Sequence, residues 1–141
     1  MSLPSADELE QLPEIEKQWA VKAMEHAETY FKLVSSVDGK TLRLTRLDDE
    51  IYEDFMNSFT DIDIETIDED LMKSDEGKKK WREWIMKYDT KVKDYNFGTL
   101  LRKSAKRGYD EDNTIFVTRM QFYAIEIARN KQGLNSYLVS K

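Results

Sequence analysis

The sequence has no cysteine, two prolines, five glycines and one histidine in 141 residues. Without cysteine the chain can form no disulfide, no thiolate nucleophile and no Cys-ligated zinc site. No two glycines lie closer than ten positions apart, whereas a phosphate-binding loop needs closely spaced glycines before a helix. A P-loop or Rossmann nucleotide site is therefore excluded by motif, and a Rossmann-type methyltransferase is disfavoured.

Long apolar runs are also missing. No stretch approaches the roughly 18 apolar residues that a membrane-spanning helix needs. The first eight residues, Met1 to Glu8, are acidic at their end and lack the apolar core of a signal peptide and the arginines of a mitochondrial presequence. We expect a cytoplasmic protein, with the nucleus as a second compartment.

The scarcity of proline and glycine points to helices. Both prolines, Pro4 and Pro13, lie near the start, so nothing interrupts a helix further on. An all-β chain would need frequent turn residues, and a hydrophobic content of 40% is enough for a core. We predict an all-α fold, a single compact domain of four to five helices with short extended or irregular connections. It would span residues 13–137, between a flexible leader at residues 1–12 and a tail at residues 138–141.

Apolar periodicity and capping residues place the individual elements. We expect Gly39 to end the first helix in a left-handed conformation, Asp48 and Ser74 to cap the second and third helices, and Thr118 to cap the last. The expected elements are, in order, a helix over 13–37, a short extended piece over 41–45, a helix over 48–59, an acidic connection over 60–73 with one helical turn, a helix over 74–96, a short helix over 99–105, a strand-like piece over 114–117, and a buried helix from 118 to about 129.

The charge is unevenly distributed. The net charge of −6 combines 6 basic and 19 acidic residues in positions 1–70 with 16 basic and 9 acidic residues in positions 71–141. Positions 78–107 alone hold 11 basic and 3 acidic residues. This region forms a candidate basic face for ribosomal RNA, for an acidic partner or for the acidic half of the same chain; the sequence leaves these open. Its members are Lys78, Lys79, Lys80, Arg82, Lys87 and Lys91.

Catalytic and metal-binding motifs are weak. His26 beside Glu25 could form an acid–base pair, but a half-exposed helical histidine is the simpler interpretation. Residues 61–72 resemble a calcium loop, yet Thr66 stands where an EF-hand has glycine and Met72 where it has glutamate. We therefore predict no catalytic residues, no metal and no cofactor.

Three blocks of the sequence resemble a known family. They are WAVKAMEHAE at positions 19–28, YNFGTLLR at 95–102, and NTIFVTR at 113–119 followed by further matching residues to 130. In this order and spacing they resemble the small eukaryotic polysaccharide-biosynthesis-domain-containing protein family, over roughly residues 14–137. A chain that stops at Lys141 resembles the short fungal members.

The resemblance implies a function. The family name points to sugar chemistry, but the chain lacks the glycine loop of a methyltransferase cofactor site. The family resemblance instead implies a dedicated cytosolic chaperone that binds the nascent GTP-binding domain of translation elongation factor 1-alpha near the ribosome. GTP would then belong only to the client. The alternatives are a polysaccharide-related enzyme such as a methyltransferase, and a ribosome- or RNA-binding module.

The matching blocks also supply candidate partner-binding residues. Arginine and aromatic side chains are common interface contacts, and several occur in these blocks together with amides. Arg119 and Glu126 have a second interpretation, since they could instead pair within the fold. The candidates are Tyr95, Asn96, Phe97, Arg102, Asn113, Arg119, Gln121, Glu126, Arg129 and Asn130.

Overall fold

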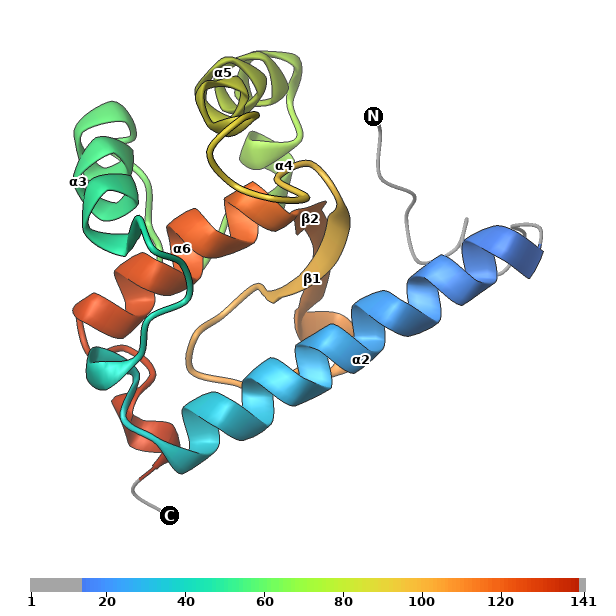
Figure 1. Ribbon diagram of the computed structural model, residues 1–141, viewed down its shortest axis with the longest axis vertical. Coiled ribbons are helices and arrows are strands. Elements are labelled where there is room, and N and C mark those ends of the chain that lie inside the picture. The colour runs from blue at the N-terminus through green and yellow to red at the C-terminus, as the bar shows by residue number, and fades with distance from the viewer. Residues whose placement is uncertain (1–13, 140–141) are drawn as a thin grey trace.

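The computed structural model describes residues 14–139, with side chains from residue 18 onward except that of Trp19. The predicted leader and the last two residues of the predicted tail lie outside this range. Within it the chain forms five α-helices and one two-stranded sheet (Figure 1). The prediction of an all-α fold is therefore wrong, because the fold is mixed α and β. The elements are α2 (Glu14–Ser36), α3 (Asp48–Ser58), α4 (Glu69–Met72), α5 (Asp75–Ile85), β1 (Gly98–Arg102), β2 (Thr114–Thr118) and α6 (Arg119–Lys131).

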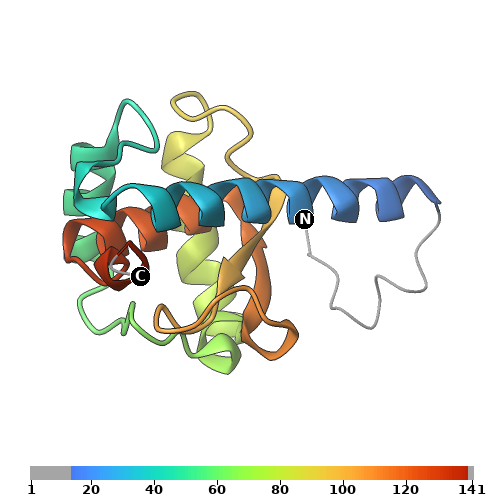
Figure 2. The same ribbon diagram turned by 90° about the horizontal axis from the view of Figure 1, so that it is seen from below.

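The sheet lies between helices. β1 and β2 are antiparallel, with Gly98 opposite Thr118 and Arg102 opposite Thr114. α2 contacts β1, and α6 contacts both strands; Figure 2 shows α2 running across the sheet. Leu100 packs against two alanines of α2, while Leu101 belongs to the main core. The strand is thus covered on both faces.

This double burial explains why β1 was predicted as a helix over 99–105. All five residues of β1 are buried, so the strand has no alternation of apolar and polar residues, and a short apolar run of this kind is ambiguous between strand and helix. β2 alternates between partly and fully buried residues, and its strand-like pattern was predicted correctly. The expected extended piece at 41–45 is absent from the described strands.

Two of the three predicted N-terminal caps are confirmed. The Ser74 side chain accepts a hydrogen bond from the Gly77 amide, and Thr118 forms a reciprocal capping box with Gln121. Asp48 is instead the first residue of α3. Its carboxylate faces the preceding loop, where it accepts the amides of Leu44 and Thr45 at 2.7 Å.

Two predicted ends differ. α5 stops at Ile85 and not near residue 96, and Asp94 adopts a left-handed conformation with φ 58°. The segment that follows provides carbonyl acceptors for the start of α6, a tertiary requirement that outweighs the helical pattern. Gly39 does not have a positive φ, whereas Gly133, just after α6, has φ 77°.

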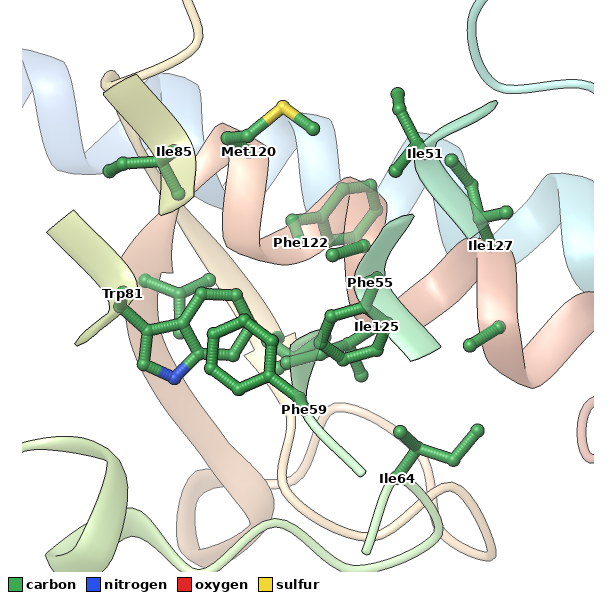
Figure 3. Packing of buried hydrophobic residues seen from close by; sticks show 14 of the residues in the cluster. Ile51, Phe55, Phe59, Ile64, Trp81, Ile85, Met120, Phe122, Ile125 and Ile127 are labelled. Carbon is green, nitrogen blue, oxygen red and sulfur yellow. The ribbon is translucent and has the colours of Figure 1, made fainter. Parts of the chain in front are cut away.

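The core lies between α3, α5 and α6 (Figure 3). Trp81 of α5 stacks on Phe59 at a ring-centroid distance of 4.2 Å, and Phe55 packs against Trp81 at 5.6 Å. On α6, Met120, Ile125 and their neighbours are buried on several sides, as predicted for a central helix. The polar residues of α6 are therefore enclosed together with its apolar ones.

Candidate protein-binding site

A carboxylate at the centre of the fold joins α2, β1, α6 and the segment that follows α6. Glu126 of α6 is fully buried and accepts hydrogen bonds from the Tyr30 hydroxyl at 2.7 Å and from the Asn135 amide at 3.0 Å. Arg102 of β1 donates to the same carboxylate at 3.2 Å, and Arg129 donates at 2.7 Å. Both arginines are also fully buried. We call these residues and Asn130 the Glu126 network.

Arg129 extends this network to the backbone. Its Nε donates to the Ile64 carbonyl at 2.6 Å, and its terminal nitrogens donate to the carbonyls of Arg102 and Lys103 at 2.9 and 3.0 Å. One buried side chain thus ties the acidic connection before α4 to the end of β1. Buried charges are stable only when they are paired and hydrogen-bonded in this way.

The charges of the network reinforce one another. Burial by itself raises the pKa of Glu126, but Arg102 and Arg129 outweigh it and hold that pKa at about 2. Burial, and then the Glu126 charge, raise the pKa of Tyr30 well above its usual value. The glutamate is therefore ionised and the tyrosine neutral, and the network presents one anion to two cations.

Five of the ten candidate binding residues lie in the interior. Asn130 donates to the Tyr30 hydroxyl at 3.1 Å and accepts from Asn135 at 2.7 Å. Asn113 fixes the loop between the strands, donating to the carbonyls of Ser104 and Gly108. In this fold Arg102, Asn113, Glu126, Arg129 and Asn130 do not reach the surface, so they position other groups and do not form a contact surface.

The other five candidates come together at the start of α6. The amide of Arg119 donates to the Phe97 carbonyl at 2.7 Å, and the amide of Met120 donates to the Tyr95 carbonyl at 2.8 Å. These bonds satisfy amides that a helix otherwise leaves unpaired at its first turn. They also hold Phe97 in place while 53% of its surface remains exposed. We call Tyr95, Asn96, Phe97, Arg119 and Gln121 the α6 patch.

The α6 patch contains polar groups beside its aromatic rings. Gln121 accepts the Thr118 amide at 2.8 Å through its side-chain oxygen. The Nε of Arg119 is buried and has no hydrogen-bond partner among the described residues. Arg119 does not pair with Glu126, because the two residues are seven positions, or about 10 Å, apart along the helix axis. The patch is thus a partly exposed, prearranged group of two aromatic, two amide and one guanidinium side chains.

His26 lies on α2 and packs on the inner side of this region. Its Nδ1 is 2.8 Å from the Thr99 hydroxyl, and its ring contacts Phe122 edge-on at 5.2 Å. Burial, and then the nearby Arg119 charge, lower the pKa of His26. Glu25, the imagined catalytic partner, is exposed. The simpler interpretation of His26 as a half-buried helical residue agrees with this geometry.

Only three of the six residues of the candidate basic face contact an aromatic ring or a carboxylate in the described structure. Lys80 lies over the Phe59 ring at 4.6 Å, Lys87 pairs with Asp54 at 2.8 Å, and Lys91 lies over Tyr88 at 5.9 Å. The remaining members, Lys78, Lys79 and Arg82, are exposed on α5. The aromatic residues between them, Trp81, Trp84 and Tyr88, are buried and cannot stack on bases in this fold.

The acidic and basic halves meet at four ion pairs in the described part of the chain. Lys73 reaches Glu69 at 3.0 Å within α4 and its C-cap. Lys87 reaches Asp54, Lys106 reaches Glu65 at 2.9 Å, and Lys131 reaches Asp49 at 2.6 Å. Several carboxylates of the acidic connection have no ion-pair partner in the described part of the chain, among them Asp61, Asp63 and Asp68. The two halves therefore neutralise each other only in part.

The chain is similar to known proteins over most of its length. A family model described as PBDC1 protein matches residues 15–140. The chain belongs to the PBDC1 family. The resemblance drawn from the three sequence blocks is thereby confirmed, and the five candidate residues of the α6 patch lie in two of those blocks.

Individual PBDC1 relatives show the extent of the match. The chain is 50% identical to Protein PBDC1 homolog of Saccharomyces cerevisiae, covering all of this chain and 99% of that protein. It is 49% identical to human Protein PBDC1 over 96% of this chain, and it spans about six tenths of the length of the human and mouse proteins. A solution NMR structure of a Saccharomyces cerevisiae protein, 49% identical, aligns with a TM-score of 0.84 over all of this chain and 97% of that one.

The sequence did not reveal every important residue. Tyr30 was not among the candidate residues, because an aromatic residue on the first helix is typical of a core position. Asn135 carried no signal, because it is one polar residue in a short segment after Gly133. A groove beside the acidic connection was also missed. In residues 14–139 no helix is long and apolar enough to cross a membrane, and no group of three or more metal-binding side chains occurs in this range.

Proposed function

We propose that the protein is a binding protein for an unfinished or partly folded client, and that the α6 patch is its contact surface. The observation that carries this proposal is the position of Phe97, whose ring is half exposed while its carbonyl is fixed to α6. Binding costs less when an aromatic contact is already ordered in the free protein. Exposed large apolar side chains of this kind are typical of protein interfaces.

The client in this proposal is translation elongation factor 1-alpha, through its GTP-binding domain. The family resemblance implies this client, whereas the relatives are named only PBDC1. The α6 patch is compatible with a protein client, because it combines aromatic rings with the partly exposed side chain of Arg119. Aromatic and arginine side chains are common contacts in protein interfaces.

The Glu126 network has a supporting role in this proposal. Arg102 leads directly from β1 into the core, and α6 carries both the network and the patch. A rigid interior keeps the patch in one arrangement while the client changes its conformation. No chemical step is required of the chain, and GTP is bound by the client alone.

The test uses the tagged full-length chain in a translating lysate. We expect elongation factor 1-alpha in the eluate, and a reduced amount with Phe97→Ser, because this substitution removes the exposed ring and leaves the backbone bonds. Val37→Ser is the matched control, since Val37, directly after α2, is exposed to a similar degree, 41% against 53% for Phe97. Circular dichroism checks that each variant folds.

The same experiment can refute the proposal at two levels. Absence of elongation factor 1-alpha from the wild-type eluate would exclude this client. Equal recovery with wild type and Phe97→Ser would exclude the α6 patch as the contact surface. RNA recovered in place of the client would favour the ribosome-binding alternative.

A further inference from the structure

A groove runs between the acidic connection and α5, away from the α6 patch. It has a volume of about 430 Å³. Part of its lining is apolar and comes from the segment between α3 and α4, from α4 and from α5. The apolar lining residues are Phe59, Ile62, Ile67, Leu71, Met72 and Trp81.

Leu71 makes this groove more apolar than an ordinary surface depression. It lies on α4 and has 67% of its surface exposed, the largest value among the exposed large apolar side chains of the described residues. Figure 1 shows α4 lying next to α5. The neighbouring Met72 is buried, so Leu71 is the side chain of α4 that remains available at the groove.

Carboxylates surround the apolar lining. Asp61, Asp63 and Asp68 lie on the groove, with Lys80 as the single cation among its lining residues. A second hollow of about 330 Å³ shares two of these aspartates and adds Glu69, Asp70 and Lys103. The two hollows together present five carboxylates and two lysines, so the local charge is negative.

The aspartates keep oxygen atoms for a ligand. Asp63 Oδ1 accepts the amides of Glu65 and Thr66, and Asp68 Oδ1 accepts the amide of Leu71. In the described part of the chain, the second oxygen of each of these two aspartates has no hydrogen-bond partner. The same residues therefore order the loop through one oxygen and offer charge through the other.

The loop that forms the groove is held at several points. The Ile67 amide donates to the Lys103 carbonyl at 2.9 Å, and the Ala105 amide donates to the Glu65 carbonyl at 2.8 Å. Arg129 holds the Ile64 carbonyl from inside the fold. Binding grooves of this kind are usually formed before the ligand arrives, which reduces the entropy cost of binding.

We propose that this groove binds a short segment of a partner protein that combines large apolar side chains with lysine or arginine. The apolar lining accepts the large side chains, and the aspartates attract the basic groups. An anionic ligand is disfavoured by the same charges. This surface is separate from the α6 patch, and the inference does not depend on the identity of the client.

The probe is a fluorescein-labelled decapeptide of alternating leucine and lysine, titrated with the full-length chain and followed by fluorescence anisotropy. We expect it to bind, with amide NMR shift changes concentrated at residues 59–72 and 77–81. Two comparison peptides, alternating leucine with glutamate and serine with lysine, should bind weakly or not at all. Equal binding of the leucine–glutamate peptide would overturn the role of the aspartates, and equal binding of the serine–lysine peptide would overturn the role of the apolar lining. Failure of the leucine–lysine peptide to bind would overturn the whole proposal.

Substitutions locate the site. The triple variant Asp61→Asn, Asp63→Asn, Asp68→Asn retains the capping oxygens, since asparagine also caps helices, and should weaken binding by roughly tenfold or more. Leu71→Ser should also weaken binding. Lys80→Gln should strengthen it, because it removes the cation of the groove lining.

The matched control is Asp110→Asn, Glu111→Gln, Asp112→Asn, which removes the same charge from an exposed acidic cluster between β1 and β2. It should leave binding within about twofold, because exposed charges at a distance are largely screened. An equal loss of peptide binding in both triple variants would show that the peptide responds only to the net charge of the chain. That result would overturn the groove as the binding site. Self-association of the chain that the first triple variant abolishes would identify a second copy as the occupant and also overturn the proposal.

Discussion

Replacing Glu126 with glutamine tests the role of the buried network most directly. The substitution keeps the size of the side chain but removes the negative charge that faces Arg102 and Arg129. It also turns one acceptor oxygen into an amide that donates, at a position where the Tyr30 hydroxyl and both guanidinium groups donate. The arginines are fully buried, so water cannot replace the lost partner.

The expected cost is large compared with the stability of the fold. Removing one partner of a buried ion pair typically costs about 3–5 kcal/mol, while the free energy of unfolding of a domain is about 5–15 kcal/mol. Since each kcal/mol lowers the melting temperature by about 2–4 °C near this chain length, we expect Glu126→Gln to lower it by roughly 6–20 °C.

Urea unfolding provides the measurement, with the fluorescence of buried Trp81 and Trp84 as the signal. Glu28→Gln is the control, because Glu28 is exposed on α2 and has no hydrogen-bond or ion-pair partner in the described part of the chain. Its effect should stay within about 0.5 kcal/mol. A loss below about 1 kcal/mol for Glu126→Gln would refute the argument that the arginines depend on this charge.

The pH dependence provides a second readout of the same substitution. The pKa of Glu126 is about 2 in the folded protein, against an ordinary value of 4.5. Because the folded-state pKa is the lower one, the stabilisation is fully present above pH 4.5 and is lost as the pH falls toward 2. The stability difference between wild type and Glu126→Gln should shrink by roughly 3 kcal/mol across this window. A constant difference from pH 5 to pH 2 would contradict this.

Three further outcomes are expected. The single histidine, His26, should titrate below the ordinary pKa of 6.5, because it is partly buried and lies near the Arg119 charge. The NMR signals of its ring protons measure this pKa directly. A pKa at or above 6.5 would contradict this placement of the ring. Gly39→Ala should destabilise the fold by about 1–3 kcal/mol, since the new methyl group would overlap the buried Asn130 side chain, whereas Gly108→Ala, with 3.4 Å to its nearest contact, should change stability little. Thr118→Ala removes the capping box of α6 and should cost about 1 kcal/mol in thermal or urea unfolding; an unchanged midpoint would show that the cap is dispensable.

The local elements were largely predictable from the sequence. The caps at Ser74 and Thr118 and the buried character of α6 depend on neighbouring residues, and such signals are present in the chain itself. Whether the residues of β1 form a strand depends instead on the helices that cover them. Because α2 and α6 bury both of its faces, its sequence carries no alternation, and a short apolar run with glycine before it was assigned as a helix.

The candidate site was predictable only in part. The residue types were informative, because arginine, glutamate and asparagine on an otherwise apolar helix marked α6 as a source of candidate binding residues. Whether they point outward or inward depends on packing from several directions, which periodicity does not show. Glu126 pairs with Arg102, 24 positions earlier on a strand, and this partner could not be found while the strand was read as a helix.

The Glu126 network also limits the order in which parts of the chain can fold during synthesis. Its bonds join residues 96 positions apart, from Tyr30 to Glu126, and they also need Asn135, nine positions after Glu126. Contacts this distant in sequence form late, because the chain must close long loops first. During synthesis α2 is complete before α6 is made. The Tyr30 hydroxyl therefore has no partner in this network until Glu126 and Asn130 have been added to the chain.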